Sequence, residues 1–328
     1  MKRLLILLLI LNCTACTALP AEERAFAVAL LVEAEDNQYR VYGRIPTYQT
    51  GGGYCTVQGE GSSLGAALLD MEGTSPMGGE LSQLRLLVMD VGLKERIVPV
   101  LQELSERADV RQSCLAAVTE AKLSDLAEAL KPSMGARLSK TLDILAETRQ
   151  EQGRIPWTTL GDVILMAERE CPVLPVVTLN KGQVELSGGK PVSMSGKLGS
   201  TLSEREYGLL ALAKSETQRL EVTVPNGTAR LRDGKTRNIL APTLTTAEVS
   251  IMLRLTDTAC SEDELEEILA HELLALLTDL YAQGFDVLGL GRNAVCQTAD
   301  WPSWQTLDWL EMLPQIRWKI SVGVTGPV

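Results

Sequence analysis

The sequence predicts an α+β protein with two mixed α/β domains, or three if residues 181–200 form a small unit of their own. The chain has 328 residues, a length that suits about two domains, and 45% of them are hydrophobic, which is ample for sizeable cores. Helical and strand-like segments alternate in the first half. In the second half, alternating strands precede one long amphipathic helix, so we expect antiparallel strands packed against that helix.

The first domain is predicted over residues 25–180 and begins with a β-hairpin. Residues 26–32 are apolar, residues 36–38 form a polar turn, and residues 39–45 alternate. Ser62 is the expected N-cap of the first helix. The remaining strands are predicted at 54–57, 84–89, 114–119 and 173–179. The helices are predicted at 63–71, 97–108, 124–130, 138–152 and 158–170.

The second domain is predicted over residues 181–328. Ser203 and Glu206 have capping-box spacing and begin a helix that runs to residue 214. Ser261 begins the longest helix, whose apolar residues recur every three or four positions until Gly284, a residue typical of helix C-termini. Strands are predicted at 183–186, 192–195, 219–224, 228–232, 246–256 and 317–324.

The first residues have the features of a bacterial export signal. Lys2 and Arg3 precede an eight-residue apolar core, which is shorter than the roughly 20 residues that a membrane span needs. Thr14 and Ala15 then precede Cys16, the small-residue pattern that comes before an acylated cysteine in bacterial lipoproteins. We therefore expect residues 1–15 to be removed as a signal peptide.

Acylation would make Cys16 the lipid attachment site and residues 16–24 a tether. Two or more acyl chains hold a protein stably on a membrane, so the mature body would be anchored on the extracytoplasmic face. Cys13 is the rival acylation site, although Leu11 and Asn12 before it fit the pattern less well. Ordinary signal-peptide cleavage, which would release a free secreted protein, is the other alternative.

The charge balance and the cysteines exclude several classes of function. The chain carries 31 Lys and Arg against 42 Asp and Glu, a net charge of −11, and no basic run follows the start. Binding to nucleic acid or to anionic lipid through a polybasic segment is therefore not predicted. The cysteines after residue 16 are odd in number and scattered, which indicates neither a disulfide framework nor a zinc site: Cys55, Cys114, Cys171, Cys260 and Cys296.

The last fifty residues have an unusual composition. The long helix is followed by Phe-Asp-Val-Leu-Gly-Leu-Gly over residues 285–291, and four of the five Trp come later: Trp301, Trp304, Trp309 and Trp318. Gly289 and Gly291 form a fragment of a dinucleotide fingerprint, but they follow a helix and not a buried strand. We interpret the segment as a tight backbone passage that Asp286 caps or holds.

The order of these parts resembles the C-terminal segment of the Ger(x)C family, the lipoprotein C-subunits of spore germinant receptors. In that family a long helix runs into an Asp-x-hydrophobic-Gly-hydrophobic-Gly element, then a Trp-containing helix and a final strand. Further matches are Glu60-Gly61-Ser62, Leu174-Pro175 and Lys197-Leu198-Gly199, the last followed by Leu202 and Glu206. The chain departs from the family in having Ala18-Leu19-Pro20 in place of an initial Trp-Asp pair, and in having no His in its first half.

The resemblance implies a non-enzymatic lipoprotein subunit of a spore germinant receptor, made during sporulation and needed for the response to germinant. It implies a place on the outer face of the inner spore membrane, with two multi-spanning membrane subunits as partners and with no cofactor or metal. Cys16 would carry the lipid. Asp286, Gly289, Gly291, Trp301 and Trp304 are the expected partner-contact or structural motif.

Two other classes of function fit parts of the sequence. A lipid-anchored extracytoplasmic solute-binding protein fits the lipid anchor, but the repeated α/β units of such proteins are not evident. The segment 61–65 satisfies G-x-S-x-G, the nucleophile elbow of serine hydrolases. The only His of the chain, His271, lies on the polar face of the long helix, whereas a triad His lies on a loop. His271 and Glu272 also lack the second His of a zinc motif.

Overall fold

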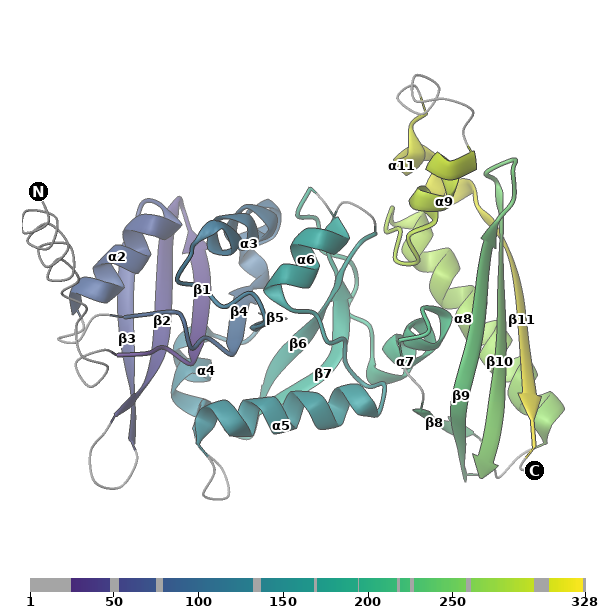
Figure 1. Cartoon of the computed structure of the whole chain (residues 1–328), viewed down its shortest axis with the longest axis horizontal. Coiled ribbons are helices and arrows are strands. Elements are labelled where there is room, and N and C mark those ends of the chain that lie inside the picture. Colours follow the sequence, from purple (N-terminus) through teal and green to yellow (C-terminus); the bar gives the residue numbers. More distant parts are fainter. Residues whose placement is uncertain are drawn as a thin grey trace, which may run out of the picture.

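In the computed structural model, the described residues form two mixed β-sheets with helices packed on them (Figure 1). The structure describes residues 25–47, 53–74, 79–131, 137–167, 170–193, 195–216, 219–224, 227–257, 261–297 and 307–326. In this part of the chain no helix is both long and apolar enough to cross a membrane. The mixed α/β class predicted from the sequence is confirmed.

The first sheet has seven strands in the order β3-β2-β1-β4-β5-β6-β7. Its central strands β1, β4, β5 and β6 are parallel, and the strands toward both edges pair antiparallel. β7 extends this sheet beyond residue 180, where the sequence places the domain boundary. The strands are β1 (Ala29–Glu35), β2 (Gln38–Thr47), β3 (Gly53–Gly61), β4 (Leu86–Asp90), β5 (Leu115–Thr119), β6 (Val173–Asn180) and β7 (Gln183–Pro191).

The predicted hairpin forms between β1 and β2. Asp36 and Asn37 occupy the turn with positive φ values of 50° and 80°, as a two-residue hairpin turn requires, and short polar side chains tolerate that conformation. At the next connection, the N-cap of the first helix differs by one residue from the prediction. Ser63, and not Ser62, accepts a hydrogen bond from the Ala66 backbone N at 3.1 Å.

Helices cover both faces of the first sheet, because each central strand is apolar on both sides. One face packs against α2 (Leu64–Thr74), α3 (Ile97–Glu106) and α6 (Leu160–Ala167), and a short 3₁₀ helix, η2 (Val91–Arg96), precedes α3. The other face packs against α4 (Leu123–Ala129) and α5 (Leu138–Glu151) (Figure 1). This part of the chain is therefore a three-layer α/β/α unit, with more parallel α/β character than the sequence indicates.

The second sheet has four strands in the order β11-β10-β9-β8. β9 pairs antiparallel with both β8 and β10. β10 and β11 are parallel, so the prediction of antiparallel strands is wrong for β10 and β11. The reason is α8 (Glu262–Ala282), which carries the chain back along the sheet before β11 begins. The strands are β8 (Arg219–Val224), β9 (Gly227–Leu240), β10 (Thr246–Asp257) and β11 (Arg317–Thr325).

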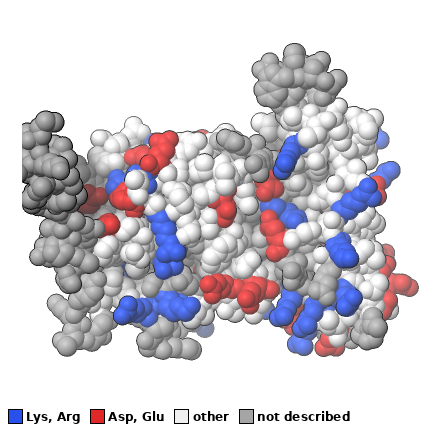
Figure 2. All heavy atoms as spheres, in the orientation of Figure 1, with Lys and Arg blue, Asp and Glu red and all other residues white. Residues whose placement is uncertain are grey.

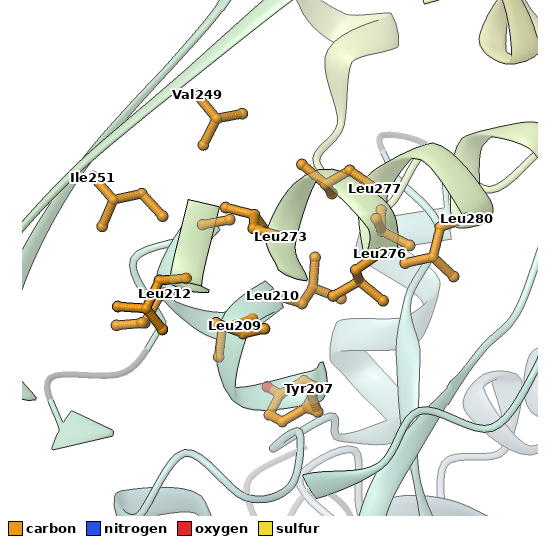
Figure 3. Close-up of a cluster of buried hydrophobic side chains, with 14 of the residues drawn as sticks. Tyr207, Leu209, Leu210, Leu212, Val249, Ile251, Leu273, Leu276, Leu277 and Leu280 are labelled. Atoms are coloured by element: carbon orange, nitrogen blue, oxygen red, sulfur yellow. The ribbon is translucent and has the colours of Figure 1, made fainter. Parts of the chain in front are cut away.

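One face of this sheet is covered by α7 (Glu204–Ala213) and α8, whose apolar residues form a continuous core with the strands (Figure 3). The labelled side chains in Figure 3 come from α7, β10 and α8: Tyr207, Leu209, Leu210, Leu212, Val249, Ile251, Leu273, Leu276, Leu277 and Leu280. Each fully buried Leu or Ile contributes about 2 kcal/mol of transfer free energy. The remaining elements are α9 (Leu290–Gln297), α11 (Trp309–Met312) and η3 (Leu313–Gln315).

Candidate functional site at the junction of the two sheets

The long helix α8 ends in a Schellman motif, and the segment 285–291 identified from the sequence follows it. Gly284 has a φ of 87°, which favours glycine. Its backbone N donates to the Tyr281 carbonyl, and the Phe285 backbone N donates to the Leu280 carbonyl, both at 3.0 Å. The Phe285 side chain is fully buried. The chain therefore turns sharply inward, toward the core, immediately after the helix.

The Asp286 side chain is the centre of this segment, and only 6% of its surface is exposed. One carboxylate oxygen, Oδ1, accepts hydrogen bonds from the Tyr281 hydroxyl at 2.6 Å and from the Leu290 backbone N at 2.8 Å. The other, Oδ2, accepts from the Gly291 backbone N at 2.6 Å and from the Trp309 indole Nε1 at 3.1 Å. The carboxylate thus caps α9, where the positive end of the helix dipole favours a negative charge.

Gly289 and Gly291 are each required by the local geometry, but for different reasons. Gly289 has a φ of 64°, in the left-handed region that favours glycine. Gly291 lies against the indole of Trp309, and a Cβ at this position would be 2.7 Å from its Nε1 and 3.1 Å from Asp286 Oδ2. A larger residue at 291 would therefore push the indole away from the carboxylate.

Tyr281 connects the carboxylate to the last strand. Burial, followed by the charge of Asp286, raises the pKa of Tyr281 well above its usual value of 10, so the phenol stays protonated and donates to Asp286. Its ring packs edge-to-face against Trp318 of β11, with ring centroids 4.7 Å apart. The motif is thereby joined to the four-stranded sheet.

Backbone and side-chain contacts join the same segment to the first sheet. The Asp286 carbonyl accepts a hydrogen bond from the Cys171 backbone N at 2.9 Å, two residues before β6. Burial raises the pKa of the Cys171 thiol to about 11. Lys197 Nζ donates to the Gln283 carbonyl at 2.9 Å and lies 5.5 Å from the centroid of the Phe285 ring. Asp286 is therefore part of the junction between the two sheets.

A buried ion network lies close to this junction. Lys214 Nζ, on a side chain that is 10% exposed, contacts Glu170 Oε1 at 3.2 Å and Glu216 Oε1 at 2.8 Å. Burial lowers the pKa of Lys214, but the two carboxylates outweigh it and the net pKa is raised. Burial raises the pKa of Glu170 against the opposing effect of Lys214. The network fixes the end of α7 against the segment that follows α6.

A hollow of about 360 Å³ lies beside the Asp286 segment. Leu165, on its α6 side, is 64% exposed, an unusual exposure for a leucine in a helix that packs on a sheet. Glu170 and Arg292 supply charged side chains at its border. The complete lining is Asp162, Leu165, Met166, Glu170, Leu288, Gly289 and Arg292.

The hydrogen bonds of the Asp286 carboxylate give this residue a structural part in the site. Four donors already occupy the Asp286 carboxylate, so it holds segments of the chain together. Within the described ranges, no group of three His, Cys, Asp or Glu is placed to hold a metal ion. Ser63 caps α2 on the first sheet, whereas His271 is exposed on α8, which packs on the second sheet.

The structure brings together Asp286, Gly289 and Gly291 of the residues predicted from the sequence. Cys16, Trp301 and Trp304 lie outside the described residues. Sequence reasoning missed Tyr281 and Trp309, the two side-chain donors to Asp286. Tyr281 precedes Asp286 by five residues across a helix end, so only the Schellman turn brings the two side chains together.

Comparisons with known proteins agree on one kind of relative. Residues 18–179 match the model of the spore germination protein N-terminal domain. The fold is similar to the crystal structure of the GerBC protein, with a TM-score of 0.56 and 15% sequence identity, over 90% of this chain and 96% of that protein. At this identity the structural likeness concerns the fold. No curated protein matches the chain in sequence.

Proposed function

We propose that the chain is a spore germination protein of the Ger(x)C family and serves as a non-enzymatic, lipid-anchored subunit of a spore germinant receptor. The observation that carries the proposal is the match of residues 18–179 to the spore germination protein N-terminal domain. The fold shared with the GerBC protein over 90% of the chain supports it. In this role the protein is needed for the response of the spore to germinant.

The proposed location is the outer face of the inner spore membrane, with the lipid on Cys16 as the anchor. The export signal and the small residues before Cys16 support this location. The proposed partners are multi-spanning membrane subunits of the same receptor. Asp286, Gly289 and Gly291 would keep the junction between the two sheets rigid, and the hollow beside them, with the exposed Leu165, offers a place for a partner side chain.

Replacing the proposed lipid site tests the anchoring. Cys16→Ala should move the protein from the membrane fraction of spores to the soluble fraction and reduce the germination response, because the acyl chains are lost. Cys13→Ala is the matched control, since this cysteine would leave with the signal peptide, and that variant should stay in the membrane fraction. Release by Cys13→Ala alone would place the lipid on Cys13. Retention of both variants in the membrane would contradict the lipid anchor.

Co-purification tests the receptor role. The protein, extracted from spore membranes with detergent, should be recovered together with multi-spanning membrane proteins. Recovery with a transporter permease would contradict the proposal and favour a solute-binding protein. In that case, a screen of thermal unfolding against amino acids, sugars and nucleosides should find a stabilising ligand.

A further inference from the structure

A hollow of about 250 Å³ lies between the seven-stranded sheet and α5. Leu86 of β4, Leu115 of β5 and Leu186 of β7 line its floor, and each of them is at most 5% exposed. All three belong to the apolar core on the face that α4 and α5 cover. Protein interiors hold few empty spaces larger than a water molecule, and an apolar cavity of about 150 Å³ is enough to bind benzene. The hollow is therefore large enough for a small organic molecule.

The pairing of the strands explains why the core has a gap here. β5 and β6 are hydrogen-bonded only over the last two residues of β5. Earlier in β5, Leu115 pairs instead with Thr159, a residue outside the strands, through an isolated bridge. The helix on this side presents Ala146 to the hollow, and its single methyl group fills little of the space. The hollow is thus built into the sheet and its covering helix.

The rim of the hollow holds a positioned cation. Arg111 and Ser113 both border the hollow, and Arg111 Nε donates to Ser113 Oγ at 2.6 Å. This bond orients the guanidinium and leaves its two terminal nitrogens for other acceptors. Among the described residues, no ion pair of Arg111 is found. Arg85 also borders the hollow, but it has an interaction of its own, so Arg111 is the cation with donors to offer.

An exposed indole lies at the same rim. Trp157 borders the hollow with 36% of its surface exposed, whereas Trp is highly buried on average. A rigid aromatic side chain at the mouth of a hollow can cover the apolar part of a bound molecule. An apolar floor, an aromatic wall and a few converging polar groups are the combination typical of small-molecule sites.

These groups favour one chemical class of ligand. The floor buries hydrocarbon, and a guanidinium binds a carboxylate through two parallel hydrogen bonds. A nucleotide fits poorly, because the hollow is smaller than the usual site for a drug-sized molecule and lies at the amino ends of β4 and β5, while doubly wound sheets bind nucleotides at the carboxyl ends. Figure 2 shows side chains of both charges over the part of the molecule where α5 lies, so no extended field of one sign favours a large polyanion.

We propose that this hollow binds a small carboxylic acid with an apolar body, of the aromatic or branched aliphatic kind. The carboxylate accepts hydrogen bonds from Arg111 at the rim, and the hydrocarbon lies on Leu86 and Leu186 below Trp157. Glu147, the acidic residue of the rim, is exposed, so solvent and salt screen its repulsion. The proposal is independent of the proposed function, because every group involved belongs to the first sheet, α5 and their connections.

Calorimetric titration of the full-length protein in detergent, with phenylacetate as the probe, tests the proposal. Phenylacetate should bind, and its neutral isostere phenylacetamide should bind at least about tenfold more weakly, because the hydrogen bonds from the guanidinium then lose their charged acceptor. Acetate, which has the same charge without the ring, should give no measurable binding, because it buries almost no apolar surface.

Two substitutions locate the site. Arg111→Gln should weaken phenylacetate to the level of phenylacetamide and leave phenylacetamide unchanged, a pattern that a general loss of structure would not produce. The matched control is Lys140→Gln, which removes the same charge from an exposed position of α5 outside the hollow and should bind phenylacetate as the parent does. Ala146→Leu should weaken both ligands at least about tenfold, because the larger side chain occupies the hollow.

Thermal unfolding accompanies each titration. Ala146→Leu should unfold no earlier than the parent, because its added methyl groups enter an existing space. Should it unfold earlier, the smaller Ala146→Val replaces it, with a loss of binding again expected. Equal affinity of the parent for phenylacetate and phenylacetamide would overturn the proposal, as would no binding at about 10 mM phenylacetate, a concentration that detects even millimolar affinity. Unchanged phenylacetate binding by Arg111→Gln or by the folded Ala146 variant would also overturn it.

Discussion

The Asp286 carboxylate shows how one buried charge can organise a junction. Its four donors come from the end of α8, the start of α9 and the indole of Trp309. Its own carbonyl accepts a hydrogen bond from Cys171, next to the first sheet. A buried charge is costly unless it is fully bonded, and here the backbone donors and the helix dipole satisfy it. The residue therefore fixes several segments at once.

Removing this carboxylate should destabilise the protein strongly. Asp286→Ala leaves buried donors of Tyr281, Leu290 and Gly291 without an acceptor, so the free energy of unfolding should fall by about 3 kcal/mol or more. Asp286→Asn should cost less, because one oxygen remains. Denaturant unfolding measures both. The exposed Asp263→Ala, in the first turn of α8, is the control and should cost less than about 1 kcal/mol. Equal losses for Asp286→Ala and the control would contradict the role of Asp286.

At the scale of the element, the two predicted capping residues differ in how completely they cap. Ser203 forms a full box, in which its side chain accepts from the Glu206 N while Glu206 Oε2 accepts from the Ser203 N at 2.7 Å. Ser261 accepts from the Glu264 N at 3.3 Å, and no return bond is shown. The sequence spacing is the same in both, so only the structure separates them.

Ser203→Ala should lower the free energy of unfolding by about 1 kcal/mol, because the first turn of α7 loses its acceptor. Ser261→Ala should cost less, since the Ser203 hydroxyl also donates to Glu206 Oε2 at 2.7 Å, whereas Ser261 accepts from the Glu264 N without a reciprocal bond. Thermal unfolding of the two variants under the same conditions compares them. A larger loss of stability for Ser261→Ala would show that the full capping box at Ser203 adds no stability.

The sequence could predict most elements, and the errors have physical causes. Strict alternation predicts β10 closely, because one of its faces is buried and the other exposed. The prediction ends β9 at residue 232, because Asp233 and Gly234 are typical of turns. In the structure the strand continues to Leu240, and these two residues lie where its register with β10 shifts. The parallel direction of β11 could not be predicted, because alternation carries no information on direction.

The same reason explains why the distribution of charge on the four-stranded sheet could not be predicted. On the face that α7 and α8 do not cover, Lys and Arg recur at alternate positions of the strands and form no basic run in the sequence. Only the register of the strands shows that Arg219, Arg232 and Arg254 are neighbours. By contrast, Asp286 and the two backbone donors that it caps lie within six residues of each other. Over such a short range, the spacing of residues in the sequence predicts which groups meet.

At the scale of the whole molecule, the two sheets are joined by interlocking contacts. Gln283 accepts from Lys197 through its carbonyl, and Phe285 packs against Gly199. On another side, Arg149 of α5 donates to Glu204 of α7 at 2.6 Å. The contacts at Gln283 and Phe285 lie next to Asp286, which suggests that the two halves unfold together.

Gly199→Val should loosen this junction. A Cβ at this position would lie 3.0 Å from Phe285 Cε2, and the added methyl groups would displace the ring, at a cost of about 1–3 kcal/mol. Calorimetry should then show two unfolding transitions where the parent shows one, and proteases should cut near residues 193–202. Gly73→Ala is the control, because a Cβ there meets nothing within 4 Å. A single transition at the parent temperature would contradict the tight packing of Gly199.

The parallel pairing of β10 with β11 has a consequence for the synthesis of the protein. β10 ends at Asp257 and β11 begins at Arg317, so the ribosome makes β10 well before its neighbour. At about 5–20 residues per second, β10 has one unpaired edge for several seconds, and a strand with one apolar face and an open edge can pair with another chain. A chain truncated within this interval would keep that edge permanently, so premature termination in this region should yield aggregates instead of a shortened, soluble protein.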